Sequence, residues 1–406
     1  MRTSYNVCSK LWYDINIDFV RKNIRHCCKA TRDHETTQEE IDRLGKDVFN
    51  HSVVTQHARR TMLVRNKLPH VCTDCIKHEP NSIRHVWNVW SDADIDTKRK
   101  HLQTDDHHTN YIEFDLGPQC DLACVYCGPW SSTTWAKELG WENKTKIDPV
   151  WKESVLENLT KYIVTLPKSS TIAFNILGGE PTLMKETYEI IERLKTVCDH
   201  FDHKPVMMIT TNLNTKTALM TRFLKILEET KDIFKWSVAV SIEDIGERAE
   251  AIRYNLDWKR FSENLVKINE LADLVYLTTT FNSMNFPYFG EFIDWSFATM
   301  GEGYGSRWMY STNSVQDGYS DIAYLRPDQI DVTGIKQALK KHATVSNNTT
   351  QKMFDHLDNL ESRLGTKAID DKFVEHWEQL VARRGLDYLN LFPVIKDVID
   401  EYKNAH

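Results

Sequence analysis

The chain alternates between two kinds of hydrophobic pattern. In one, β-branched and aromatic residues follow each other in short runs or at every second position, as in strands. In the other, apolar residues recur three and four positions apart, as in helices that pack on a core. The predicted strands are 111–117, 171–177, 205–211, 236–242, 274–281 and 307–312. The predicted helices between them are 150–163, 184–197, 216–229, 258–272 and 287–299. This alternation predicts an α/β fold with a parallel sheet.

The segments before and after these elements have different patterns. Near the start, Thr37 and Glu40 form a capping box that opens a helix. In the last part of the chain, leucines and aromatic residues recur at helical spacing among many charges, and Gly385 is a helix stop. We therefore divide the chain into an N-terminal module at 1–108, a central α/β domain at 109–330 and a helical C-terminal extension at 331–406.

Composition excludes several classes of protein. Of 406 residues, 41% are hydrophobic and 11% aromatic, which is enough for packed cores and too much for a disordered chain. No apolar run approaches the ~18 residues that span a bilayer, and the first residues lack the apolar stretch of a secretion signal. We expect a cytoplasmic protein with no membrane partner. The net charge of −7 argues against a protein that coats nucleic acid, though not against an enzyme that acts on nucleotides.

Nine cysteines carry the strongest chemical signal. In a reducing cytosol, clustered cysteines indicate metal binding or catalysis rather than disulfides. Cys120, Cys124 and Cys127 lie within eight residues, just after the first predicted strand of the central domain. Three thiolates at these spacings suit a [4Fe–4S] cluster that lacks a fourth cysteine, so that one iron stays open to a ligand. The alternative is a zinc ion completed by a histidine such as His107 or His108.

A second motif follows the strand predicted at 171–177 and consists of Gly178, Gly179, Glu180 and Pro181. Glycines let the backbone approach a ligand closely, and proline restricts the turn. The glutamate can accept hydrogen bonds from an ammonium group. By itself the motif could be a plain turn between a strand and a helix.

Together the two motifs resemble the radical S-adenosylmethionine (radical SAM) superfamily. The resemblance depends on Cys120, Cys124 and Cys127, on Tyr126 and on residues 178–181. It implies a partial (β/α)6 barrel in which the three catalytic cysteines hold a [4Fe–4S] cluster and S-adenosylmethionine (SAM) binds the open iron. It also implies that Tyr126 lies near the adenine and that the second motif contacts the SAM amino group. In that family an electron from the cluster cleaves SAM to methionine and a 5′-deoxyadenosyl radical, which takes a hydrogen atom from the substrate.

Polar residues at other strand ends are further candidates for SAM binding, because the active sites of such barrels gather at the carboxyl ends of the strands. Thr211-Asn212 resembles a segment that contacts SAM in relatives, and Ser241 and Glu243 stand where relatives place polar groups near the ribose. Arg253 is a candidate partner for the SAM carboxylate. The alternative for each residue is an ordinary turn or a helix cap.

Five more residues are weaker candidates. Asn282 ends the fifth predicted strand, and it too could be an ordinary turn residue. Trp130, Tyr304, Trp308 and Tyr310 are predicted near the mouth of the barrel, where their rings could stack on a flat substrate. Aromatic residues in such positions equally belong to the core.

Cys8, Cys27, Cys72 and Cys75 form a second group, with Cys28 as an alternative to Cys27. Four thiolates make a closed ligand set, and spacing alone does not separate structural zinc from a fully ligated iron–sulfur cluster. The segment resembles the SPASM/twitch module of radical SAM enzymes in its shorter, twitch form. Here the module precedes the barrel, as in the N-terminal-twitch group. The resemblance implies a second, auxiliary [4Fe–4S] cluster.

These observations predict a radical SAM enzyme that modifies a peptide or small molecule by oxidation or bond formation, since an auxiliary cluster can accept an electron from the substrate radical. A flavodoxin- or ferredoxin-type protein is the expected electron donor. One alternative is an isomerase or modifying enzyme that acts on a modified nucleotide or amino acid. An alternative of another class is a scaffold that binds metal and has lost its chemistry.

Overall fold

The computed structural model describes most of the chain. The described residues are 8, 10–27, 30, 34–65, 69–72, 108–316, 318–343 and 348–406. Cys28, Cys75 and His107, which the sequence analysis names as candidate ligands, lie outside these residues.

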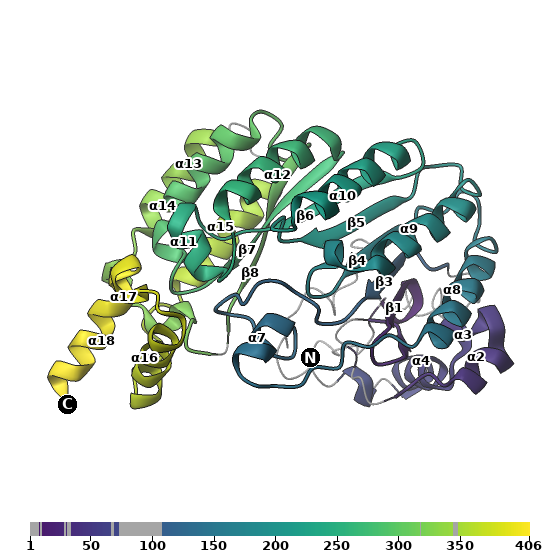
Figure 1. The fold of residues 1–406 in the computed structure, drawn as a ribbon, viewed down its shortest axis with the longest axis horizontal. Coiled ribbons are helices and arrows are strands. Elements are labelled where there is room, and N and C mark those ends of the chain that lie inside the picture. The colour runs from purple at the N-terminus through teal and green to yellow at the C-terminus, as the bar shows by residue number, and fades with distance from the viewer. Residues whose placement is uncertain are drawn as a thin grey trace. The chain divides into compact units, whose positions relative to one another are not determined.

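The strands form one mostly parallel sheet in the order β2-β1-β3-β4-β5-β6-β7-β8 (Figure 1). Their bounds are β1 Asp14–Asp18, β2 Asn23–Arg25, β3 Tyr111–Asp115, β4 Ala173–Leu177, β5 Val206–Thr211, β6 Lys235–Ser241, β7 Leu274–Phe281 and β8 Trp308–Ser314. The registers of β1/β3, β3/β4, β4/β5, β6/β7 and β7/β8 are parallel, whereas β2 is antiparallel to β1. The α/β class and the six predicted strands are confirmed, while β1 and β2 are additions that the sequence analysis missed.

The chain divides into two compact units. The first unit comprises residues 1–119, 144–209 and 229–236, and the second comprises 120–143, 210–228 and 237–406. Each unit is described by itself below.

The helices of the first unit are α1 Lys10–Tyr13, α2 Gln38–Leu44, α3 Val48–His51, α4 Val53–Arg65, α8 Pro149–Ile163 and α9 Lys185–Cys198, with short 3₁₀ turns at Gly45–Asp47, His70–Cys72 and Pro181–Leu183. Helices α2, α8 and α9 confirm predictions from the sequence, whereas α1, α3 and α4 were not predicted. The first half of the predicted capping box is present, because the side chain of Thr37 accepts a hydrogen bond of 3.1 Å from the backbone of Glu40.

Alternation along the strands gives the sheet of the first unit two different faces. On one face, buried isoleucine and phenylalanine side chains of β1, β3 and β4 make a core against α8. Phe19 connects the layers, since its ring lies 6.4 Å from Phe114 of β3 and 6.0 Å from Trp151 of α8. On the other face the same strands present polar residues, among them Asn16, Glu113 and Asn175.

The second unit holds the C-terminal helices that the sequence predicts after residue 331. Its helices are α7 Thr133–Glu138, α11 Gly246–Ile252, α12 Trp258–Leu271, α13 Phe289–Met300, α14 Val332–His342, α15 Asn348–Glu361, α16 Asp371–Arg384, α17 Tyr388–Leu391 and α18 Pro393–Ala405, with 3₁₀ turns at Phe286–Tyr288, Ile322–Tyr324 and Pro327–Gln329. Helix α10 Thr217–Thr230 belongs in part to each unit. Gly385 ends α16 in the left-handed region at φ 63°, which glycine adopts without strain. No helix among the described residues is long and apolar enough to cross a membrane.

Candidate functional site

The three clustered cysteines lie in the second unit, on a loop between β3 and α7. Cys124 is buried, with 8% of its surface exposed, whereas Cys120 and Cys127 are partly buried. Burial raises the pKa of the Cys124 thiol to about 12 and also raises that of Cys127. Buried thiols lose their protons when a cation or a metal stabilises the thiolate. Three soft sulfur donors in such a loop fit an iron–sulfur cluster.

The backbone of this cysteine loop runs beside the residues that follow α11. The N–H of Ala123 donates to the carbonyl of Tyr254 at 3.0 Å, and the N–H of Val125 donates to the carbonyl of Ile252 at 2.8 Å. These two bonds flank Cys124 on both sides. The central cysteine is therefore held by main-chain pairing on either side of it.

The first turn of α7 holds the loop through its side chains. The hydroxyl of Thr133 accepts from the Cys120 N–H at 3.1 Å and donates to the Cys120 carbonyl at 3.0 Å. The hydroxyl of Thr134 donates to the same carbonyl at 2.8 Å, and the indole N–H of Trp135 donates to the Cys124 carbonyl at 2.7 Å. Buried carbonyls need such partners, so α7 stabilises the conformation of the loop.

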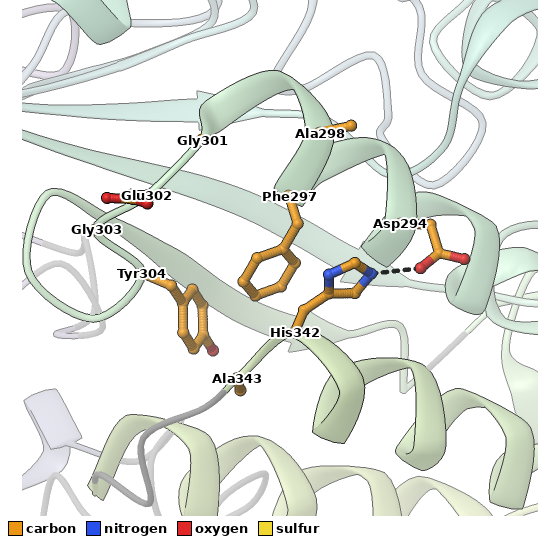
Figure 2. Close-up of a pocket in the computed structure, with 9 residues that line it drawn as sticks. All are labelled: Asp294, Phe297, Ala298, Gly301, Glu302, Gly303, Tyr304, His342 and Ala343. Atoms are coloured by element: carbon orange, nitrogen blue, oxygen red, sulfur yellow. Dashed lines mark hydrogen bonds and ion pairs between the residues drawn. The ribbon is translucent and has the colours of Figure 1, made fainter.

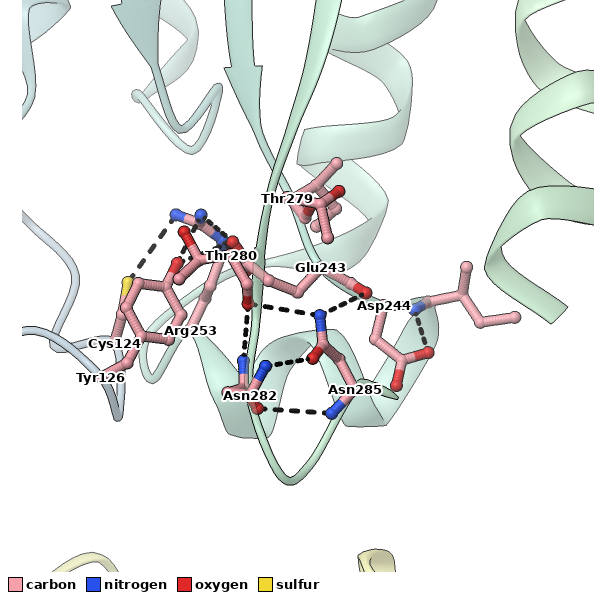
Figure 3. Close-up of polar contacts among 11 residues, drawn as sticks. Cys124, Tyr126, Glu243, Asp244, Arg253, Thr279, Thr280, Asn282 and Asn285 are labelled. Carbon is pink, nitrogen blue, oxygen red and sulfur yellow. Dashed lines mark hydrogen bonds and ion pairs between the residues drawn. The ribbon is translucent and has the colours of Figure 1, made fainter. Parts of the chain in front are cut away.

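A charged network connects the end of β6 to the cysteine loop (Figure 3). Arg253 donates from Nε and Nη2 to the two carboxylate oxygens of Glu243, each at 2.6 Å. Its Nη2 also donates to the hydroxyl of Tyr126 at 2.7 Å, and that hydroxyl donates to Glu243 at 2.7 Å. From Nη1 the guanidinium reaches the sulfur of Cys124 at 3.7 Å. Glu243 is 1% exposed and Arg253 5% exposed, so this is a buried ion pair.

The charges of this network are set by burial and pairing. Burial alone would lower the pKa of Arg253, but the Glu243 carboxylate raises it well above its ordinary value. Burial raises the pKa of the Tyr126 phenol well above 10. At neutral pH, Arg253 is therefore a cation beside Cys124, and Tyr126 is a neutral donor to Glu243. The arrangement brings together three residues that the sequence analysis assigns separately to SAM.

The turn after β7 supports the same network. The side-chain oxygen of Asn282 accepts from the Met284 N–H at 2.9 Å, and its amide donates to the Thr280 carbonyl at 2.9 Å. Asn285 donates to the Glu243 carbonyl at 3.4 Å. Asn282 is fully buried and forms the turn, which is the structural alternative given for it from the sequence.

Asn212 follows β5 and lies next to the first cysteine of the loop. Its amide donates to Asp121 at 2.9 Å and lies 4.0 Å from the sulfur of Cys120. Asn214 donates to the other oxygen of Asp121 at 3.0 Å. Sequence reasoning missed Asp121 and Asn214, although a carboxylate between two cysteines and a second asparagine after Asn212 were visible signals.

The other two candidates at strand ends are Thr211 and Ser241. Thr211 is 1% exposed, and its hydroxyl accepts from the Leu213 N–H at 3.1 Å, as in a turn. Ser241 is the last residue of β6 and is partly buried.

The C-terminal extension covers the cysteine loop within the second unit. Val125 and Trp135 belong to one apolar cluster with residues of α16 to α18. The Arg384 guanidinium of α16 lies over the rings of Trp135 at 4.3 Å and Tyr254 at 4.5 Å. It also pairs with Glu138 of α7 at 3.2 Å. These contacts tie α16 to both segments that hold the loop.

The glycine motif lies in the first unit and is paired with the residues that precede Cys120. The N–H of Gly179 donates to the Gly117 carbonyl and that of Glu180 to the Gln119 carbonyl, both at 2.7 Å. A Cβ on Gly179 would lie 2.8 Å from the carbonyl carbon of Pro118, which is backbone and cannot move aside. Only glycine fits this close approach.

Glu180 is fully buried at the start of the 3₁₀ turn that begins at Pro181. One carboxylate oxygen accepts from the N–H of Thr182 at 3.1 Å and from its hydroxyl. The carboxylate is therefore oriented before any ligand binds.

Three of the candidate cysteines near the N-terminus, Cys8, Cys27 and Cys72, are among the described residues of the first unit. Cys8 and Cys72 both pack on a small apolar cluster of the first unit that includes Trp12 and Met62. Cys27 is partly buried and lines a small cavity. No three His, Cys, Asp or Glu side chains of the described ranges gather where they could hold one metal ion. A [4Fe–4S] cluster differs from such a site because each cysteine binds a separate iron.

A cavity of about 660 Å³ opens between the ends of α13 and α14 (Figure 2). The ring of His342 stacks on Phe297 at 4.7 Å and contacts Asp294 at 2.5 Å, and Tyr304 lines the same cavity. Since Tyr304 precedes β8, this cavity lies at the amino ends of the strands.

The interpretation of two aromatic residues as part of the barrel mouth is therefore wrong. Tyr304 precedes β8 and Trp308 is its first residue, whereas the mouth is formed by the carboxyl ends of strands. Trp308 is fully buried and Tyr310 is 6% exposed, so both belong to the core. Trp130, just after the cysteine loop, is 66% exposed.

Comparisons with known proteins bear on the segment that contains both motifs. Residues 115–296 match the family model described as the Radical SAM superfamily. Similar solved structures include SuiB of Streptococcus suis bound to S-adenosylmethionine, at 14% identity and a TM-score of 0.40, with 61% of this chain and 52% of that chain covered. SuiB bound to its precursor peptide SuiA is 15% identical, with a TM-score of 0.40 and coverage of 64% and 55%. The chain thus spans about half the length of these SuiB chains. No curated protein matches it.

Proposed function

Because residues 115–296 form a radical SAM domain, we propose that this chain is an enzyme that cleaves SAM reductively and takes a hydrogen atom from a substrate. The observation that carries the proposal is the cysteine loop, in which three thiols are buried or partly buried and the Cys124 sulfur lies 3.7 Å from the Arg253 cation. A scaffold without chemistry would have no need of a buried charge at that position, since buried ion pairs seldom add stability.

Cys120, Cys124 and Cys127 would hold the [4Fe–4S] cluster. When bound, the cluster supplies the electron that cleaves SAM to methionine and the 5′-deoxyadenosyl radical. The chain itself holds the loop in place through α7, excludes water with the C-terminal helices, and places Arg253 beside Cys124. A nearby cation stabilises the thiolates that the cluster requires.

Glu180 and the backbone of Gly178 and Gly179 would bind the amino group of SAM. One feature supports this assignment: the buried Glu180 carboxylate is oriented by Thr182. An ammonium group is attracted to such a carboxylate and donates hydrogen bonds to it.

Four further contacts with SAM remain part of the proposal. Tyr126 would lie near the adenine, and Thr211, Asn212 and Ser241 would contact the ligand from the strand ends.

Arg253 and Glu243 have a more specific role in the proposal than the sequence suggests. Four of the five N–H donors of Arg253 are directed at Glu243, Tyr126 and Cys124. The pair would thus position the cysteine loop and Tyr126. The fifth donor, on Nη1, would be available to the SAM carboxylate.

A second cluster on Cys8, Cys27, Cys72 and Cys75 belongs to the same proposal. It would accept an electron from the substrate radical, and the net reaction would then be oxidation or bond formation on a peptide or small molecule. A flavodoxin- or ferredoxin-type protein would reduce the first cluster.

Formation of 5′-deoxyadenosine tests the proposed function directly. The full chain is purified without oxygen, reconstituted with iron and sulfide, and incubated with SAM and dithionite, titanium(III) citrate or reduced flavodoxin. We expect 5′-deoxyadenosine by mass spectrometry with at least one reductant, and none without SAM. If no reductant yields it from protein that contains iron and sulfide, the proposal is wrong.

A further inference from the structure

A polar row crosses the first unit on the face of the sheet opposite its apolar core. The registers of β1, β3 and β4 align Asn16 with Glu113 and Glu113 with Asn175. The three side chains are 1%, 5% and 9% exposed. A buried row of this kind costs free energy unless its polar atoms have partners.

Neutral donors surround the carboxylate of Glu113. Asn16 donates to one oxygen at 2.7 Å, while the Tyr111 hydroxyl and the Asn175 amide donate to the other at 3.1 and 3.2 Å. Asn175 also donates to the Tyr111 hydroxyl at 2.7 Å. Among the contacts of the described residues, Glu113 has no hydrogen bond or ion pair with a cation. Its negative charge is thus solvated by dipoles only.

The side-chain oxygen of Asn16 has no partner, although it is buried. The orientation of this amide follows from chemistry, because a carboxylate accepts and the NH₂ group must therefore face Glu113. The oxygen is left as an acceptor without a donor. Asn16 and Glu113 both line a cavity of about 240 Å³, together with Lys10, Asp14, Tyr111 and Cys27, the last of which is also a proposed ligand of the auxiliary cluster.

The balance of charges in this cavity is negative. Lys10 pairs with Asp14, so its charge is already offset, whereas Glu113 adds a second carboxylate. Burial raises the pKa of Asp14, and the nearby charge of Glu113 adds to that rise even though Lys10 opposes it. A ligand that carries positive charge and N–H donors would satisfy both the Asn16 oxygen and the Glu113 carboxylate.

We propose that the cavity on the polar face of β1 and β3 binds a primary ammonium group, with Asn16 and Glu113 as acceptors for its N–H donors. The inference makes the substrate an amine, and this part of it rests on the proposed function. The binding of an ammonium group in the cavity does not depend on that function.

Three probes of equal length and different charge test the site: n-butylamine, 1-butanol and butyrate. Their dissociation constants for the reconstituted full chain are measured at neutral pH by ligand-observed NMR. We expect n-butylamine to bind at least ten times more tightly than 1-butanol, and butyrate more weakly than either. Equal affinities for the three probes would overturn the inference.

Two substitutions test whether n-butylamine binds in this cavity: one is expected to weaken its binding and the other to strengthen it. Glu113→Gln should weaken n-butylamine binding at least ten-fold and leave 1-butanol unchanged, because it removes charge and keeps size. Lys10→Met, at a partly exposed position, should strengthen n-butylamine binding several-fold, because Asp14 becomes available to the ligand. If Glu113→Gln does not fold, Lys10→Met still decides, since unchanged or weaker binding contradicts the inference. Glu142→Gln, at an exposed glutamate, is the matched control and should bind like the original chain.

The two proposals fail separately. Equal binding of the three probes by protein that still produces 5′-deoxyadenosine would overturn the ammonium site alone. Selective binding of n-butylamine by protein that produces none would support the site and contradict the radical SAM activity.

Discussion

The two groups of cysteines are held in different ways. The loop from Cys120 to Cys127 is fixed by hydrogen bonds from α7, by pairing with residues 252–254 and by a buried ion pair. Of the N-terminal group, Cys8 and Cys72 share a small apolar cluster, while Cys27 lines a cavity. A compact motif brings its thiols together through local structure, whereas the candidate ligands of the N-terminal group lie far apart in the sequence and depend on tertiary packing.

The largest expected effect comes from removing the loop cysteines. In a Cys120→Ala/Cys124→Ala/Cys127→Ala variant, we expect iron to fall from about eight to about four atoms per chain, because one of two [4Fe–4S] clusters is lost. Formation of 5′-deoxyadenosine should stop. Cys198→Ala is the control, since Cys198 is buried in α9 and belongs to neither group. A triple variant that keeps its iron would show that the loop does not hold a cluster.

The converse variant removes two N-terminal cysteines. Cys8→Ala/Cys72→Ala should again lower iron to about four atoms per chain, but it should retain reductive cleavage of SAM, because the loop is intact. Iron and zinc are measured by plasma mass spectrometry. If the original chain contains about four iron atoms and one zinc, the N-terminal site holds zinc, and the proposed electron acceptor is wrong.

Removing one partner of the buried ion pair beside the loop should cost more stability than removing one partner of a surface pair. Arg253→Met leaves Glu243 buried without a cation, and we expect a loss of about 3–5 kcal/mol in the free energy of unfolding, with less iron bound. Adding Glu243→Gln should recover part of that loss, since the uncompensated charge disappears. Urea denaturation gives both values.

Lys161→Met is the control for Arg253→Met. It removes the exposed pair between Lys161 and Glu157 and should change nothing measurable. If the Arg253→Met/Glu243→Gln double variant loses as much stability as the two single variants added together, the coupling between Arg253 and Glu243 is contradicted.

The smallest expected effect is the pH dependence of stability caused by His376 in α16, one of the helices that cover the cysteine loop. Burial, followed by the charges of Arg383 and Arg384, lowers the pKa of His376 in α16 to about 4. The folded state thus binds fewer protons than the unfolded state, and the contribution of His376 is complete above pH ~6.5 and lost as pH falls toward 4. Between pH 7 and 5 we expect the original chain to lose about 2 kcal/mol more than His376→Phe, which keeps the ring. If the free energy of unfolding changes equally with pH in the two proteins, the lowered pKa of His376 is contradicted.

Secondary structure in the central domain could be predicted because the relevant signals are local. The six predicted strands and the helices between them agree with the structure to within a few residues, and Asp148 and Pro149 start α8 as a cap and a first-turn proline would. Strand β1 was missed, although Asp14-Ile-Asn-Ile-Asp18 alternates. It forms a local antiparallel hairpin with β2, but β2 has only three residues and gives a weak signal, and the parallel partner β3 begins only at Tyr111.

By itself the sequence determined the order of the elements and the two motifs, since hydrophobic period, turn residues and cysteine spacing are properties of neighbouring residues. Only the tertiary structure decided which polar side chains meet. It paired Arg253 with Glu243, brought both to Tyr126 and Cys124, and aligned Asn16 with Glu113 across two strands. The physical reason is that buried charges and amides are stable only with partners, and those partners come from distant parts of the chain.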